Sequence, residues 1–203
     1  MSIKIDFKIF AFILLLLLSG QTQIYLMIFA FAIIHEIGHL ICGLALGLKP
    51  QSMKLMPMGL SITFKKENKK WWKELLVSVA GPITNFILAI VFMFMGQTKI
   101  VYANLLIGIF NLIPIIPLDG GRALKSVFRK IFTYRTADKY IHAISNITMV
   151  GLTVFASIGT IYLKNITVPI IIFYLWLIVI GENKRYKMKK KMQKSIEIMQ
   201  KMC

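Results

Sequence analysis

Acidic residues and cysteines are scarce in this sequence of 203 residues. Eight Asp and Glu stand against 25 Lys and Arg, which gives a net charge of +17, and 57% of the residues are hydrophobic. A typical soluble domain has about 25% charged residues, whereas this chain has 16%. The composition therefore excludes an ordinary soluble domain and indicates a membrane protein. The two cysteines, Cys42 and Cys203, exclude a framework of disulfides.

Six apolar segments have roughly the length that a bilayer requires. They cover residues 7–19, 23–48, 72–95, 100–118, 141–162 and 168–180. Gly, Pro, Asn, Ser and Thr occur within several of them, and neighbouring helices in a bundle can accommodate these residues. The sequence thus predicts an all-α polytopic membrane protein with about six transmembrane helices.

The basic residues lie on one side of this predicted arrangement. Residues 1–8, 49–73, 122–139 and 184–201 contain 23 of the 25, and Lys99 and Lys164 lie in the other two loops. The positive-inside rule then places both termini in the cytoplasm. A basic surface can also bind nucleic acid, but topology already explains the charge. The expected surroundings are a lipid bilayer, with no nucleic-acid partner.

The second predicted span contains the sequence His35-Glu36-Ile37-Gly38-His39. Two histidines four residues apart project from one face of a helix, close enough to share one zinc ion. Glu36 can hold the water that the metal acidifies and accept its proton. A chance match in an apolar core is the alternative, but an ionisable group inside a membrane span by default marks a functional site. The sequence therefore predicts one Zn²⁺ per chain with Glu36 as the catalytic base.

A catalytic zinc usually has three protein ligands, so two histidines leave one to be found. Asp119 is the candidate, because it ends the fourth span in the sequence Pro117-Leu118-Asp119-Gly120-Gly121. Pro114 and Pro117 break regular helix and leave the preceding residues extended. The two glycines permit a close backbone approach to a metal. In the alternative interpretation Asp-Gly-Gly is a turn and Asp119 is solvated.

These elements together resemble the site-2 protease family of intramembrane zinc metalloproteases (peptidase M50). The resemblance is closest to the branch of the stage IV sporulation protein FB type. Three ordered motifs carry it: His35-Glu36-xx-His39, Ala80-Gly81-Pro82-xx-Asn85 and Asn111-xx-Pro114-xx-Pro117-Leu118-Asp119-Gly120-Gly121.

The resemblance implies roles for six residues. It implies that zinc is bound by His35, His39 and Asp119, that Glu36 activates water, and that Asn111 and Pro117 help to position substrate. The implied substrate is a membrane-tethered protein, namely a sporulation sigma factor precursor cut during regulated intramembrane proteolysis in the mother-cell membrane. Inhibitory membrane proteins are further partners that such a role allows.

The domain organisation departs from that branch. We expect residues 1–181 to form the protease domain and residues 182–203 a basic cytoplasmic tail. Such a tail is too short for the CBS domain that the branch commonly carries, and no PDZ-like insertion is present. Met188, Met192 and Met199 suggest that the tail is a helix lying on the anionic leaflet.

The first cytoplasmic loop has a strand-like period, since Leu60, Ile62 and Phe64 alternate with Ser61 and Thr63. By the resemblance, this segment is a small membrane-associated β element. An edge strand there could pair with an extended substrate. A hairpin that merely closes the cytoplasmic face is equally consistent with the pattern.

Five further residues and two alternative functions bear on this interpretation. Gly81-Pro82 predicts a kink in the third span, and Asn85 predicts a hydrogen bond across the bundle or a role in the site. Cys42 is more typical of an inert buried thiol than of a ligand, and His142 is expected at the membrane interface.

A metal transporter would show repeated spans, which this sequence lacks. An inactive scaffold would have no use for Glu36.

Overall fold

The computed structural model describes residues 2–5, 22–56, 59–64, 70–163 and 167–202. Along this part of the chain the elements are β1 (Ser2–Ile5), α2 (Thr22–Ala45), β2 (Pro50–Met56), β3 (Gly59–Phe64), α3 (Trp71–Phe94), α4 (Thr98–Asn111), α5 (Asp119–Ile131), α6 (Tyr134–Leu163) and α7 (Thr167–Met202). The protein is mainly helical with a small β element, in agreement with the predicted fold class. The first predicted span lies outside the described residues.

Three helices in the described part of the chain are long and apolar enough to cross a membrane. They cover Leu26–Ala45, Trp71–Phe94 and Tyr134–Gly159, which are the second, third and fifth predicted spans. These apolar helices place the protein in a membrane. The full set of six spans stays a prediction.

The predicted fourth span is wrong in its extent. Helix α4 ends at Asn111, and its 14 residues cover only about 21 Å, less than the roughly 30 Å of a hydrocarbon core. Pro114 and Pro117 lack the N–H that a continuing helix needs, so residues 112–118 form an irregular loop. Asp119 begins the new helix α5.

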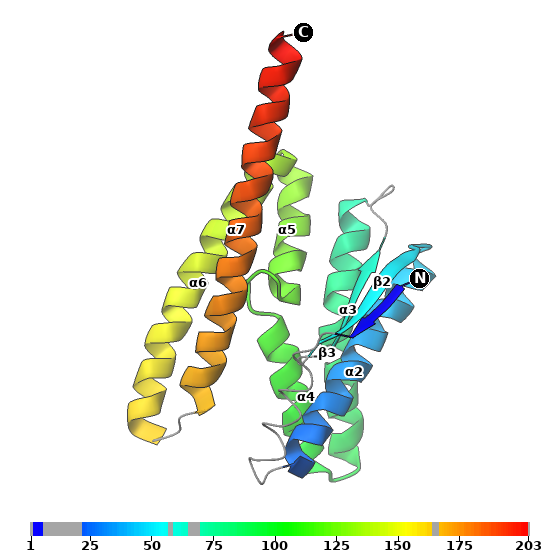
Figure 1. Cartoon of the computed structure of the whole chain (residues 1–203). Helices are drawn as coiled ribbons and strands as arrows, with labels where there is room; N and C mark the ends of the chain where they lie inside the picture. Colours follow the sequence, from blue (N-terminus) through cyan, green and yellow to red (C-terminus); the bar gives the residue numbers. More distant parts are fainter. Residues whose placement is uncertain (1, 6–21, 57–58, 65–69, 164–166, 203) are drawn as a thin grey trace.

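Helix α7 joins the sixth predicted span and the basic tail in one element of 36 residues. In Figure 1 its C-terminal part continues in line beyond the other helices, so the predicted tail helix is an extension of the sixth span, and its contact with the leaflet stays a prediction. The junction contains Gly181 but no proline, and one glycine costs a helix only about 1 kcal/mol. The proposed boundary between residues 181 and 182 therefore falls inside a helix and stays a prediction.

The three described strands form one sheet in the order β1-β2-β3, with β1 parallel and β3 antiparallel to β2. The predicted strand at Leu60–Phe64 is confirmed as β3, which is an edge strand among the described residues. Strand β1 was missed, although Ser2-Ile3-Lys4-Ile5 alternates polar and apolar residues. Phe64 anchors the sheet, because its buried ring packs with Leu48 and Val77.

The helices form two groups joined by α5. Helices α2, α3 and α4 pack on one another, α3 also packs on α5, and α6 packs on both α5 and α7. Loop 112–118 lies where the groups meet, since Ile115 is buried against Met149, Leu175 and Val179 of α6 and α7. The loop that leads to Asp119 is thus held by both groups.

Candidate metal centre

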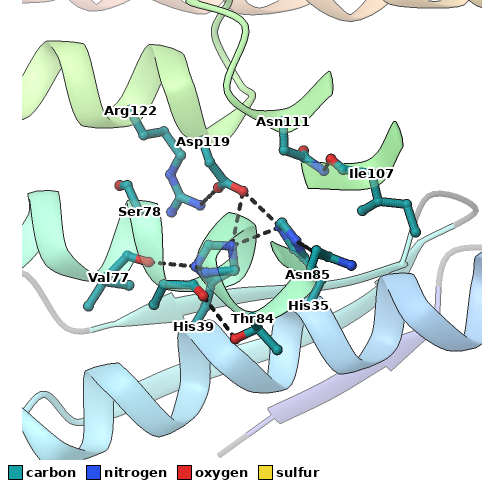
Figure 2. A network of polar contacts seen from close by, with 12 residues as sticks. His35, His39, Val77, Ser78, Thr84, Asn85, Ile107, Asn111, Asp119 and Arg122 are labelled. Carbon is teal, nitrogen blue, oxygen red and sulfur yellow. Dashed lines mark hydrogen bonds and ion pairs between the residues drawn. The ribbon is translucent and has the colours of Figure 1, made fainter. Parts of the chain in front are cut away.

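The two histidines of the His-Glu-x-x-His sequence lie on successive turns of α2 and face into the protein. Each is only 3% exposed, and their Nε2 atoms lie 3.2 Å apart. Figure 2 shows both rings pointing toward Asp119. The helical spacing of four residues therefore places two ligand-type nitrogens at one point, as the sequence predicts.

Asp119 approaches the histidines from the first turn of α5. Its Oδ2 lies 2.9 Å from the Nε2 of His35 and 3.0 Å from the Nε2 of His39. The residue is 6% exposed, so the interpretation of Asp119 as a solvated turn residue is wrong. The N-terminus of a helix favours a carboxylate electrostatically, which helps to hold the negative charge at this buried position.

The donor set fits zinc in both chemistry and spacing. His35, His39 and Asp119 each offer one ligand atom to a common point, and all three are buried. Ligand atoms about 2.1 Å from a tetrahedral zinc lie roughly 3.4 Å from one another. The separations here run from 2.9 to 3.2 Å, so the three side chains need to open by only a few tenths of an ångström. Three protein ligands leave the fourth position for water or substrate, as in catalytic zinc sites.

Hydrogen bonds from the other ring nitrogens orient both imidazoles. The Nδ1–H of His39 donates to the carbonyl oxygen of Val77, and the Nδ1–H of His35 donates to Oδ1 of Asn85. Donation from Nδ1 leaves the lone pair of each Nε2 free to bind a metal. Val77 and Asn85 both belong to α3, so this helix sets the tautomer and the ring direction.

Asn85 also connects the site to α4. Its Nδ2 donates to Oδ1 of Asn104 at 2.9 Å, and the Nδ2 of Asn104 donates to the carbonyl oxygen of Ile100. Both asparagines are fully buried. The predicted hydrogen bond across the bundle is confirmed, and the same side chain contacts a histidine of the site.

Gly81 is a site residue that the sequence interpretation missed. A Cβ at this position would lie 2.4 Å from Nε2 of His39 and 2.6 Å from Nε2 of His35. The backbone of α3 thus forms one wall of the site, and α3 runs through Pro82 as a single helix. The Ala80-Gly81-Pro82 motif carries part of the family resemblance, but the sequence analysis assigns Gly81 only a kink in the third span.

Gly120 and Gly121 serve a different purpose from the predicted approach to the metal. A Cβ on Gly120 would lie 2.0 Å from the carbonyl oxygen of Leu112, and one on Gly121 would lie 2.5 Å from that of Ile115. The two glycines therefore let the first turn of α5 pack directly on the backbone of loop 112–118. Asp119 is held in place by that contact.

The remaining predicted site residues surround this group. Glu36 is half-buried and interacts electrostatically with His39 and Asp119. Asn111 ends α4, and its amide donates to the carbonyl oxygen of Ile107 at 3.0 Å. Pro117 is exposed and follows a cis peptide bond.

Three other polar or ionisable side chains can now be placed. Arg122, which the sequence interpretation passed over, brings Nη1 to 3.8 Å from Oδ1 of Asp119. Cys42 packs beside the apolar cluster around Phe64, consistent with an inert thiol. His142 is buried in the protein, and its Nδ1–H donates to Oδ1 of Asn183 on α7; its place at the membrane interface stays a prediction.

The comparisons with known proteins agree with this geometry. Residues 23–102 and 97–156 match Peptidase family M50. The chain belongs to this family. It is 31% identical over 128 residues to a zinc metalloprotease of Methanocaldococcus jannaschii, covering 57% of this chain and 37% of that protein. It is 26% identical over 133 residues to stage IV sporulation protein FB of Bacillus subtilis, covering 61% of this chain and 46% of that protein.

One further relative and one solved structure extend the comparison. A putative zinc metalloprotease of Synechocystis is 32% identical over 118 residues, which cover 52% of this chain and 31% of that protein. The aligned regions thus span from about a third to about half of these three relatives. The solved site-2 protease from Methanocaldococcus jannaschii superposes with a TM-score of 0.68 at 24% identity, covering 89% of each chain. The fold is therefore that of a site-2 protease, as the motifs predicted.

Proposed function

We propose that this M50 chain is an intramembrane zinc metalloendopeptidase that cleaves a membrane-tethered protein. The observation that carries the proposal is the convergence of His35, His39 and Asp119 on one point beside Glu36. In this proposal the three converging residues hold the zinc and Glu36 is the catalytic base.

Each residue then has a defined task. Zinc, when bound, polarises the scissile carbonyl and acidifies the attacking water. The carboxylate of Glu36 accepts the proton of that water and delivers it to the leaving amine. The hydrogen bonds from Nδ1 to Val77 and Asn85 keep both imidazoles in the tautomer that binds metal.

We further assign the holding of substrate to loop 112–118 and strand β3. Asn111 precedes the loop that leads to Asp119 and Pro117 lies within it, and we propose that they position the substrate chain there. Strand β3 lies at the edge of the described sheet, where an extended segment can add as a further strand. An extended substrate exposes the peptide bonds that a helix shields.

The proposed setting is a bacterial cell membrane crossed six times, with both termini in the cytoplasm. The clustering of basic residues in alternate loops supports this topology. The proposed substrate is a transcription factor precursor. More specifically, we propose a sporulation sigma factor precursor. Its support is the similarity to stage IV sporulation protein FB.

Glu36→Gln tests the function, because glutamine keeps the size of the side chain and cannot accept the proton. We expect cleavage of a co-expressed precursor to fall by roughly 10²- to 10⁴-fold, the usual contribution of a general base, with the zinc content unchanged. Glu182→Gln is the matched control, since Glu182 pairs with Arg185 within α7 and has no part in the proposed site. Parent-level cleavage by the Glu36 variant would overturn the proposal.

A further inference from the structure

Ser145 of α6 makes a hydrogen bond that reaches out of its own helix. Its Oγ accepts the backbone N–H of Ile116 at 2.6 Å, and Ser145 is 1% exposed. The hydroxyl of Ser157, also on α6, behaves differently, because it donates to the carbonyl oxygen four residues earlier in the same helix. Ser145 therefore links α6 to the loop between α4 and α5.

The loop residue that Ser145 holds is coupled closely to the start of α5. A Cβ on Gly121 would lie 2.8 Å from the nitrogen of Ile116, so this backbone touches the first turn of α5 with no intervening side chain. Asp119 belongs to that same turn. A shift of Ile116 must therefore move the turn that carries Asp119, because close-packed backbones leave no slack.

The bond also satisfies a donor that would otherwise be costly. Ile116 is buried, and a buried N–H without an acceptor loses the full stabilisation that water would give it. Pro114 and Pro117, on either side, have no N–H of their own. Without the Ser145 hydroxyl, Ile116 has to move to find another acceptor, and the adjoining turn of α5 moves with it.

We infer that Ser145 is a positioning residue that holds Asp119 at the metal centre through Ile116. The inference rests on the proposed function, in which Asp119 is a zinc ligand. It assigns to α6, which supplies none of the three converging side chains, an indirect effect on zinc affinity through Ile116.

The experiment measures zinc affinity of the full chain in detergent by competition with a chromogenic chelator. Ser145→Ala should weaken zinc binding by about 10- to 100-fold, the usual effect of losing an outer-shell partner. Ser145→Thr keeps the hydroxyl and should restore most of the affinity. Ser157→Ala is the matched control, because its hydroxyl bonds within its own helix, and it should bind zinc like the parent.

A double-mutant cycle separates positioning from general destabilisation. In an Asp119→Ala background, Ser145→Ala should have little further effect on zinc affinity, since the group that it positions is gone. An equal loss in both backgrounds would overturn the inference, as would parent-like affinity of Ser145→Ala. Ser145→Cys, which is similar in size with a weaker acceptor, serves if the alanine variant does not fold. If Asp119→Ala itself keeps parent affinity, the proposed function fails as well, so the two failures are distinguishable.

Discussion

Gly81→Ala tests whether the backbone of α3 is a wall of the metal centre. The added Cβ would lie 2.4 Å from Nε2 of His39, whereas ordinary van der Waals contact begins at 3.4 Å. The imidazole must therefore retreat by about 1 Å, while a zinc–nitrogen bond tolerates about 0.2 Å. A methyl group forced into a packed interior costs about 1–3 kcal/mol, so we expect zinc affinity to fall roughly 10- to 100-fold and cleavage to fall with it.

Gly151→Ala is the matched control for this substitution. Gly151 also lies inside a helix, α6, and a Cβ there would meet nothing within 4 Å. Alanine in a helix interior is favoured over glycine by about 1 kcal/mol, so this variant should bind zinc like the parent and unfold at the same temperature or higher. Both variants are assayed by zinc content after purification and by chelator competition. Parent-like zinc affinity of Gly81→Ala would refute the argument that this glycine makes room for the histidines.

Three further predictions concern the metal, the topology and the substrate. Asp119→Ala should lower zinc occupancy as well as activity, because two imidazoles make a poor zinc site; full occupancy, measured by metal analysis, would remove Asp119 from the ligand set. In a background without native cysteines, an impermeant thiol reagent outside the cell should label Thr98→Cys and not Asn68→Cys; the reverse result would refute the six-span topology. Ile62→Pro should lose cleavage with zinc retained, because proline bars a ladder position on the edge strand, and Ile62→Val should stay active. Normal cleavage by the proline variant would mean that substrate is held elsewhere.

The three ligands could be predicted from the sequence. The histidines are close along one helix, and Asp119 lies among residues that interrupt an apolar segment. His35 and His39 are four residues apart, so they share one face of any helix that contains them. The helix itself is predicted by the long apolar run around them. Asp119 stood out because prolines and glycines interrupt the apolar pattern just before and after it. Bringing it within 3.0 Å of both histidines is a tertiary result that the motifs suggested only through the family resemblance.

The contacts that hold His39 and loop 112–118 could not be predicted, because their partners carry no sequence signal. The acceptor for His39 is the backbone carbonyl of Val77, which any residue could supply. Ser145 looks like an ordinary helix serine until its contact with Ile116, 29 residues earlier, is known. The parallel pairing of β1 with β2 likewise joins segments about 50 residues apart, beyond the reach of local periodicity.

Because α7 is continuous, the position of the basic tail is coupled to that of the loop before Asp119. Leu175 and Val179 press on Ile115, next to the backbone that Ser145 holds, and the same helix runs on to Met202. From Val179 to Met202 the helix is about 35 Å long, so a tilt of about 5° at its inner end displaces the outer end by about 3 Å. A small tilt where α7 contacts the loop before Asp119 thus corresponds to a larger displacement at the end of the tail. The positions of the tail and of the loop before Asp119 are therefore coupled through the packing of α7 on Ile115.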